Sequence, residues 1–191
     1  MKHLIFFILI TFSSVIYGQE TSYICGSGSV TLTASASGGT APYTYQWTSP
    51  SSVVTSGAVV TASASGAWYW NALDANGCAI SGTHTIIIES DPTSGITINA
   101  NNGCIGTAQT ISATGVPSGY TYSWDFGSGA NPTTSTSPTE SVSYSTSGTK
   151  TITLTIERTF TGSTNGCSET CTWVKTKTIT VGQLTGQSTC N

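Results

Sequence analysis

The stretch that decides the fold is a short aromatic string that occurs twice. Residues 42–47 read PYTYQW, and residues 119–124 read GYTYSW. Both copies contain the pattern Y-T-Y-x-W, in which the aromatic residues fall at every second position. This spacing places the rings on one face of a β-strand. The chain therefore contains two copies of one strand-forming segment.

Other landmarks recur around both copies in the same order. Cys25 and Cys104 lie 22 and 20 residues before the tryptophan of their copy. Downstream, each copy has a Ser-Gly turn, then an aromatic or β-branched run, then Asn-Gly-Cys, which falls at residues 76–78 and 165–167. Chance does not readily place four landmarks in one order, so the sequence predicts two tandem modules of one fold.

The composition favours an all-β protein that works outside the cytoplasm. Ser and Thr together make up 65 of the 191 residues, whereas only 7% of residues are charged. Abundant Thr, Val and Tyr favour strands. With five Lys and Arg in total and a formal charge of −3, the chain lacks the basic surface that nucleic acids require. Nucleic-acid binding is therefore excluded.

Polar and apolar residues alternate with period two along several segments, for example residues 30–35 and 151–156. Runs of this kind, separated by Gly, Asn and Pro turns, are typical of a β-sandwich. Strands are expected near residues 29–36, 43–48, 58–63, 67–73 and 83–89 in the first module. In the second they are expected near residues 108–113, 120–126, 139–144, 149–158 and 172–181.

The N-terminus follows the plan of a secretory signal peptide, with a charged start, an apolar run over residues 4–12 and small residues before a cut after Gly18. The apolar run is too short to span a membrane. No Cys stands at the cut for lipidation. We expect residues 1–18 to be a cleaved signal peptide, and the protein to be secreted or displayed on the cell surface without membrane insertion.

The predicted domains follow from the repeat and from a Pro- and Gly-containing junction. A first sandwich is expected over residues 19–90, a linker over 91–95 and a second sandwich over 96–182. Residues 183–191 are expected to be a linker or the start of a further module.

The second module carries SWDFGSG at residues 123–129 and SVSYSTSGTKTITLTI at residues 141–156. These strings resemble the PKD domain, an immunoglobulin-like β-sandwich of cell-surface and secreted proteins. Ser128 departs from the family pattern, which usually has Asp there, and Lys150 stands where an aromatic residue is common. The first module carries TLTASASGGTAPYTYQW at residues 31–47 and DANGC at residues 74–78. These strings resemble divergent immunoglobulin-like repeats of secreted and surface proteins of Bacteroidota. The fold class implied is all-β, with two tandem immunoglobulin-like sandwiches.

All six cysteines lie in the exported part, which indicates disulfides rather than zinc. The equivalence of the two modules predicts bridges from Cys25 to Cys78 and from Cys104 to Cys167, with Cys171 as an alternative partner of Cys104.

The last cysteine, Cys190, has two interpretations. Either it is the first cysteine of a third repeat in a longer tandem protein, or it pairs with Cys171. We favour the first, because a strand over residues 172–181 would carry the chain far from Cys171.

Two sets of aromatic residues have different expected roles. Trp47 and Trp124 are expected to fill the cores. Alternation places Trp68 and Trp70 on one strand face and Tyr69 on the other, so these three residues are candidate ligand-stacking aromatics. A covered, core-forming arrangement is the favoured alternative for them.

Catalytic and metal-binding groups are scarce. His84 is the only histidine after removal of the signal, and we expect it to face solvent on a strand between two threonines. Asp125 is expected to stabilise a turn by accepting backbone N–H bonds. Glu89 and Asp91 are too few ligands for a cation at the junction. We therefore expect no enzyme activity, no catalytic residues, no metal and no cofactor.

The leading functional interpretation is a non-catalytic spacer or adhesion module of a bacterial surface or secreted protein. Its partners would be other surface proteins, glycans or further modules of the same polypeptide. The alternative is a carbohydrate-binding accessory module of a secreted polysaccharide-degrading system.

Overall fold

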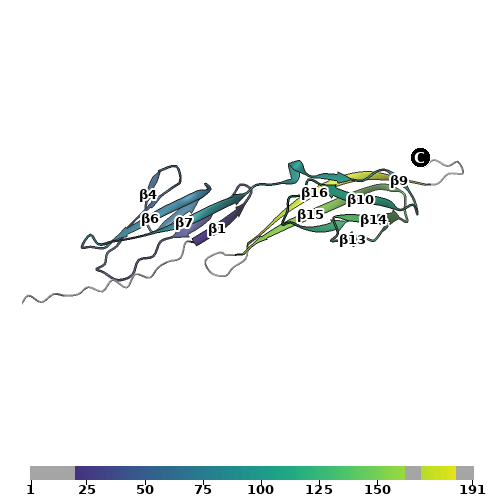
Figure 1. Ribbon diagram of the computed structural model, residues 1–191. Helices are drawn as coiled ribbons and strands as arrows, with labels where there is room; N and C mark the ends of the chain where they lie inside the picture. Colours follow the sequence, from purple (N-terminus) through teal and green to yellow (C-terminus); the bar gives the residue numbers. More distant parts are fainter. Residues whose placement is uncertain (1–19, 162–168, 184–191) are drawn as a thin grey trace, which may run out of the picture. The chain divides into compact units, whose positions relative to one another are not determined.

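The computed structural model describes residues 20–161 and 169–183. They form strands and a single 3-10 turn, η1 (Thr93–Gly95), which confirms the predicted all-β class. Two compact units are present (Figure 1): residues 20–24 with 28–88, and residues 25–27 with 89–161 and 169–183. The expected signal peptide over residues 1–18 lies outside the described residues, as does nearly all of the expected segment 183–191.

The first unit is a sandwich of a five-stranded and a two-stranded sheet. The larger sheet has the order β1 (Glu20–Cys25), β7 (Ala79–Glu89), β6 (Gly66–Leu73), β3 (Thr44–Thr48) and β4 (Val54–Ser56). The smaller sheet pairs β2 (Val30–Thr33) with β5 (Val59–Ala62). Figure 1 shows β6 and β7 as long neighbouring strands, and they pair antiparallel as a hairpin.

The core of the first unit contains the aromatic residues of one sheet face. Trp47 is 1% exposed, and its indole N–H donates to the Ala58 carbonyl at 3.3 Å. It lies opposite Trp70 in the β3–β6 ladder, with ring centroids 6.4 Å apart. The alternation of β6 also directs Trp68 into this core, and leaves Tyr69 on the outer face. The predicted core role of Trp47 is confirmed.

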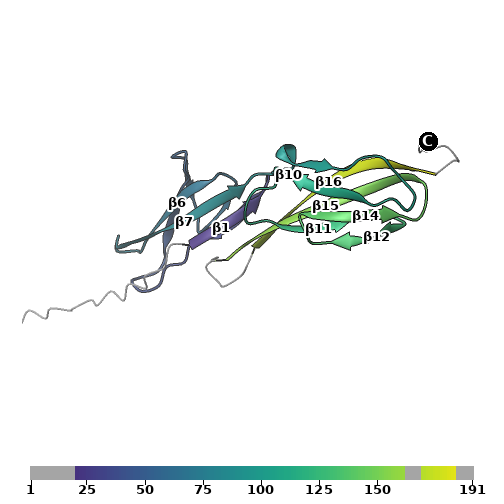
Figure 2. The same cartoon turned by 45° about the vertical axis from the view of Figure 1, so that its right-hand side comes forward.

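The second unit has two sheets, one of four strands and one of five. The smaller sheet has the order β12 (Ala130–Asn131), β14 (Thr139–Tyr144), β10 (Gln109–Thr114) and β8 (Thr97–Asn99). The larger has the order β13 (Thr134–Ser135), β11 (Thr121–Asp125), β15 (Gly148–Phe160), β16 (Glu169–Gly182) and β9 (Gly103–Cys104). Figure 2 shows β15 and β16 of the larger sheet as long neighbouring strands, and they pair along the whole length of β15.

The core of the second unit repeats the arrangement of the first. Trp124 is 1% exposed, and its indole N–H donates to the Ser137 carbonyl at 2.9 Å, as Trp47 does to Ala58. Asp125 follows at the end of β11 and accepts the Gly127 N–H at 2.8 Å. The predicted roles of Trp124 in the core and of Asp125 in the turn are therefore confirmed.

Each of the ten strands expected from the sequence is present. The missed strands are β1, β4, β8, β9, β12 and β13. Five of these have two or three residues, too few to show a period. β1 is longer, but its inward positions carry Glu20, Ser22 and Ile24, so polar residues hide the alternation.

The expected Cys25–Cys78 bridge is wrong. Cys25 is bonded to Cys171, with a Cα–Cα distance of 5.4 Å, and Cys78 is an exposed free thiol. β1 lies beside β7, and the Gly26 N–H donates to the Glu89 carbonyl at 2.8 Å, so Cys25 neighbours the last residues of β7. Cys78 precedes the first residue of β7. The eleven residues of that strand span about 36 Å, whereas bridged Cα atoms lie within about 7 Å.

The bond to Cys25 also corrects both alternatives for Cys171, which pairs with neither Cys104 nor Cys190. Cys104 is disulfide-bonded too. Its expected partner, Cys167, lies outside the described residues, so that pairing remains a prediction.

Substituting Gly82 with Ala should destabilise the first unit. A Cβ at Gly82 would lie 2.7–2.9 Å from three indole atoms of Trp70, so a core ring must move. We expect the loss to be about 1–3 kcal/mol. Urea unfolding followed by tryptophan fluorescence measures it. Gly95→Ala is the matched control, because a Cβ there meets no atom within 4 Å. Equal stability of the two variants would contradict the packing described.

The disulfide can be tested by non-reducing peptide mapping. Because no Lys or Arg lies between Lys2 and Lys150, the digest needs a protease that cuts after aromatic residues. We expect one linked pair containing Cys25 and Cys171, and alkylation of Cys78 in the native protein. Cys171→Ser should lower the free energy of unfolding by about 2–5 kcal/mol, whereas Cys78→Ser should be near neutral. A peptide linking Cys25 to Cys78 would contradict the assignment.

Candidate functional site

A serine, a histidine and a glutamate are hydrogen-bonded to one another inside the first unit. Ser22 Oγ lies 2.9 Å from His84 Nε2, and His84 Nδ1 lies 3.1 Å from Glu20 Oε2. β1 supplies Glu20 and Ser22 at alternate positions, which share one face of the strand. β7 supplies His84, which is 8% exposed.

The expectation that His84 faces solvent is therefore wrong. It lies on the same strand face as Ile86, which is 1% exposed. The threonines on either side suggested a wholly polar segment, but they lie on the opposite face. The partners of His84 come from β1, a strand that the sequence pattern does not reveal.

The three side chains have the connectivity of a nucleophile, a general base and an orienting acid. The surroundings suit a structural network instead. Ser22 is 8% exposed and lies within a strand. The neighbouring cavity has a volume of about 60 Å³, and its lining includes Glu20, Trp70 and His84 but not Ser22. Such a volume holds a few water molecules. The two hydrogen bonds give the Ser22 hydroxyl, both ring nitrogens of His84 and one Glu20 oxygen a partner.

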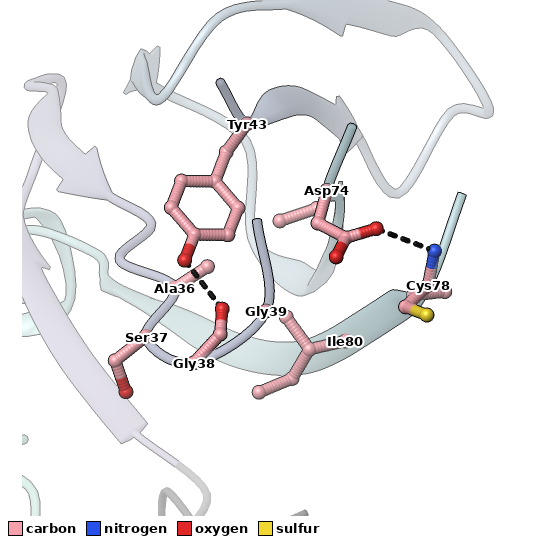
Figure 3. Close-up of a pocket in the computed structure, with 10 residues that line it drawn as sticks. Ala36, Ser37, Gly38, Gly39, Tyr43, Asp74, Cys78 and Ile80 are labelled. Atoms are coloured by element: carbon pink, nitrogen blue, oxygen red, sulfur yellow. Dashed lines mark hydrogen bonds between the residues drawn. The ribbon is translucent and has the colours of Figure 1, made fainter. Parts of the chain in front are cut away.

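A second pocket of about 150 Å³ lies where the segment 36–43 meets the β6–β7 turn (Figure 3). Its lining includes Tyr43, Asp74, Cys78 and Ile80. The Tyr43 hydroxyl donates to the Gly38 carbonyl across the pocket. The exposed Cys78 thiol lies at this pocket and is the free cysteine of the described residues.

Asp74 joins the two segments that form this pocket. Its carboxylate accepts the N–H groups of Thr40 at 2.9 Å, Cys78 at 2.8 Å and Asn76 at 2.9 Å. The bonds from Thr40 and Cys78 hold the pKa of the Asp74 carboxyl below its ordinary value of 3.8. Its contribution to stability is therefore present at neutral pH and is lost as the pH falls below that value. Asp74 thus joins the loop at Thr40 to the β6–β7 turn. The approach is close, because a Cβ at Gly39 would lie 2.6 Å from Asp74 Oδ2.

A third polar cluster belongs to the second unit and is centred on Glu89. Glu89 Oε1 accepts the Tyr120 hydroxyl at 2.7 Å and Arg158 Nη1 at 2.8 Å. The guanidinium also lies 4.9 Å from the Phe160 ring centroid. Burial, followed by the hydrogen bond to Glu89, raises the pKa of Tyr120, and the same carboxylate raises the pKa of Arg158. The cluster is a charge pair within an aromatic setting, and its carboxylate and guanidinium are already paired with each other.

The structure gives Glu89 and Asp91 separate partners, since Asp91 Oδ1 accepts the Thr93 N–H at 2.8 Å. Across residues 20–161 and 169–183, no group of three or more His, Cys, Asp or Glu side chains is arranged to hold a metal ion.

Two of the three candidate stacking aromatics are buried. Trp68 is 7% exposed and Trp70 is 9% exposed, so neither presents a ring to a ligand. The candidate stacking role is therefore wrong for Trp68 and Trp70, and the favoured core-forming arrangement is confirmed for both, because β6 directs them into the core. Tyr69 is 55% exposed.

No helix in the described part of the chain is long and apolar enough to cross a membrane.

A family model supports the resemblance of the second module to the PKD domain. The PKD domain family model matches residues 95–168. None of the curated proteins compared matches the chain. Similar solved structures include the N-terminal four Ig domains of Dscam1 isoform 1.9, at 8% identity and a TM-score of 0.31. That likeness covers 87% of this chain and 44% of the Dscam1 chain. This chain therefore spans less than half of the length of the Dscam1 chain.

Two further similar structures contain immunoglobulin domains. The amphioxus IgVJ-C2 molecule is 12% identical with a TM-score of 0.34, over 83% of this chain and 99% of that one. The complex of Dpr2 Ig1-Ig2 with DIP-Theta Ig1-Ig3 matches at 14% identity and a TM-score of 0.32, over 89% of this chain and 64% of that one.

Substituting His84 with Ala should test the structural role of the trio. We expect a loss of about 2 kcal/mol, because a buried side chain is removed and Ser22 loses its partner. The double variant His84→Ala with Ser22→Ala should lose less stability than the sum of the losses of the two single variants, since the two side chains interact. Chemical denaturation measures each value. Thr83→Ala, on the opposite face of the same strand, is the control and should change stability by less than about 0.5 kcal/mol. Additive losses would show that the two side chains do not interact.

Proposed function

We propose that this chain is a non-catalytic extracellular tandem that acts as a spacer or adhesion module of a bacterial surface or secreted protein. Residues 1–18 are its cleaved signal peptide. The strands of both sandwiches carry few charges and many Ser and Thr residues. Residues 95–168 match the PKD domain family, whose domains resemble cell-surface modules.

The observation that carries the proposal is the bond between Cys25 and Cys171. Structural disulfides form and persist in oxidising compartments and are rare in the cytoplasm. The bond therefore supports export of the chain, in agreement with the signal peptide expected from the sequence.

The partners are surface proteins or glycans rather than nucleic acids. No Lys or Arg occurs between Lys2 and Lys150, so the first unit offers no cation to a phosphate backbone. The proposed role needs no cofactor. We assign the Ser22–His84–Glu20 trio to the fold because its serine is buried away from the adjacent cavity.

One experiment tests both export and the absence of catalysis. The full chain is expressed in a bacterial host with its own N-terminus, the exported fraction is collected, and a serine-directed fluorophosphonate probe is added. We expect the chain to start near Gln19 in the exported fraction and to remain unlabelled. Retention in the cytoplasm would overturn the extracellular role. Labelling of Ser22 that His84→Ala abolishes would overturn the non-catalytic one.

A further inference from the structure

The outer face of the five-stranded sheet in the first unit carries two adjacent rows of polar side chains. In one row Thr48, Tyr69 and Thr83 lie directly opposite one another on β3, β6 and β7. In the next row Gln46, Asn71 and Ser81 do the same. Neighbouring strands lie about 4.8 Å apart, and alternate residues along a strand about 6.7 Å apart. We call these six residues the outer polar face.

Within residues 20–161 and 169–183, the outer polar face has hydrogen-bonding groups without protein partners. Gln46 and Asn71 sit side by side, and each carboxamide has two N–H donors and an acceptor oxygen. In the part of the chain that the structure describes, neither carboxamide nor the Tyr69 hydroxyl makes a hydrogen bond. Tyr69 is 55% exposed, so its ring is open to a ligand. The face therefore combines one open aromatic ring with two adjacent free amides.

The outer polar face also carries no charge. All six of its residues are uncharged, and the carboxylates of the first unit lie elsewhere: Glu20 bonds to His84 on the inner side of the sheet, and Asp74 closes the β6–β7 turn. No cation is present to attract uronates, sulfates or phosphates. A neutral ligand is therefore the electrostatic complement of this face.

We propose that the outer polar face binds a neutral polysaccharide. The apolar C–H face of a pyranose ring stacks on the Tyr69 ring, and the amides of Gln46 and Asn71 bond to neighbouring hydroxyl groups, each of which both donates and accepts. Two exposed apolar residues border this face: Val54, which lies opposite Thr48 on β4, and Leu73 on β6. The six residues themselves offer one aromatic ring among amides and hydroxyls, whereas interface cores are rich in aromatic residues, so a protein partner fits less well. The inference deepens the proposed adhesion role by giving it a class of partner.

Affinity electrophoresis of the folded mature chain tests the proposal. The gels contain neutral hydroxyethylcellulose, laminarin, galactomannan or xylan, with polygalacturonate and heparin as acidic comparisons. We expect retardation by at least one neutral polymer and by neither acidic one. Tyr69→Ala should weaken the retardation at least tenfold, and Tyr69→Phe, which keeps the ring, should retain it.

Two further variants complete the test. The double variant Gln46→Ala with Asn71→Ala should also weaken retardation and does not alter the ring. Val59→Ala changes a residue that is 54% exposed on the other sheet and should have no effect. Absence of retardation by every neutral polymer, or unchanged retardation of Tyr69→Ala, would overturn the proposal. Neither result would affect export of the chain or its failure to react with the serine probe, which test the proposed function separately.

Discussion

Both units depend on a tryptophan that is buried between two sheets. Trp47 and Trp124 are each 1% exposed, and each indole N–H reaches a backbone carbonyl of a later segment. The ring contributes a large apolar area, and the bonded N–H removes the cost of burying a donor. A single residue thus sets the separation of the sheets and fixes a connecting segment. The surrounding strands can then be short and rich in threonine.

Much of this arrangement was predictable from local sequence. Alternation located the long strands because Ile152, Leu154 and Ile156 face the core while the intervening threonines face outwards. The repeated Y-T-Y-x-W pattern identified the central tryptophans. The turn role of Asp125 was also predictable, because an aspartate can bond to an N–H two residues ahead. Each of these features is decided by residues that are close in the chain.

Features that depend on distant pairing were not predictable. β1 lies beside β7, so Ser22 meets His84 and Cys25 lies near the end of β7. Cys104 has the equivalent position in the second unit, where β9 pairs in parallel with the end of β16 and Cys104 lies opposite Gly182. The repeat drew attention to Cys25 and Cys104, but the partner of a cysteine depends on which strand end it adjoins, as the bond from Cys25 to Cys171 shows. Of the three aromatic residues that the sequence offered as ligand-stacking candidates, only Tyr69 is open to solvent, and Trp68 and Trp70 are buried. Alternation separated Tyr69 from the two tryptophans, but it did not show which of the two strand faces was covered.

The bond between Cys25 and Cys171 determines how the chain transmits force. Tension applied to segments outside the bridged loop can pass along the covalent chain from one cysteine directly to the other, without stretching the backbone between them. The strands inside the loop are shielded, and the load falls on a covalent bond. Reduction of this bond would transfer the load to the segment between the two cysteines, whose sequence separation is 146. Under load, the redox state of this one bond therefore sets the length of the linkage.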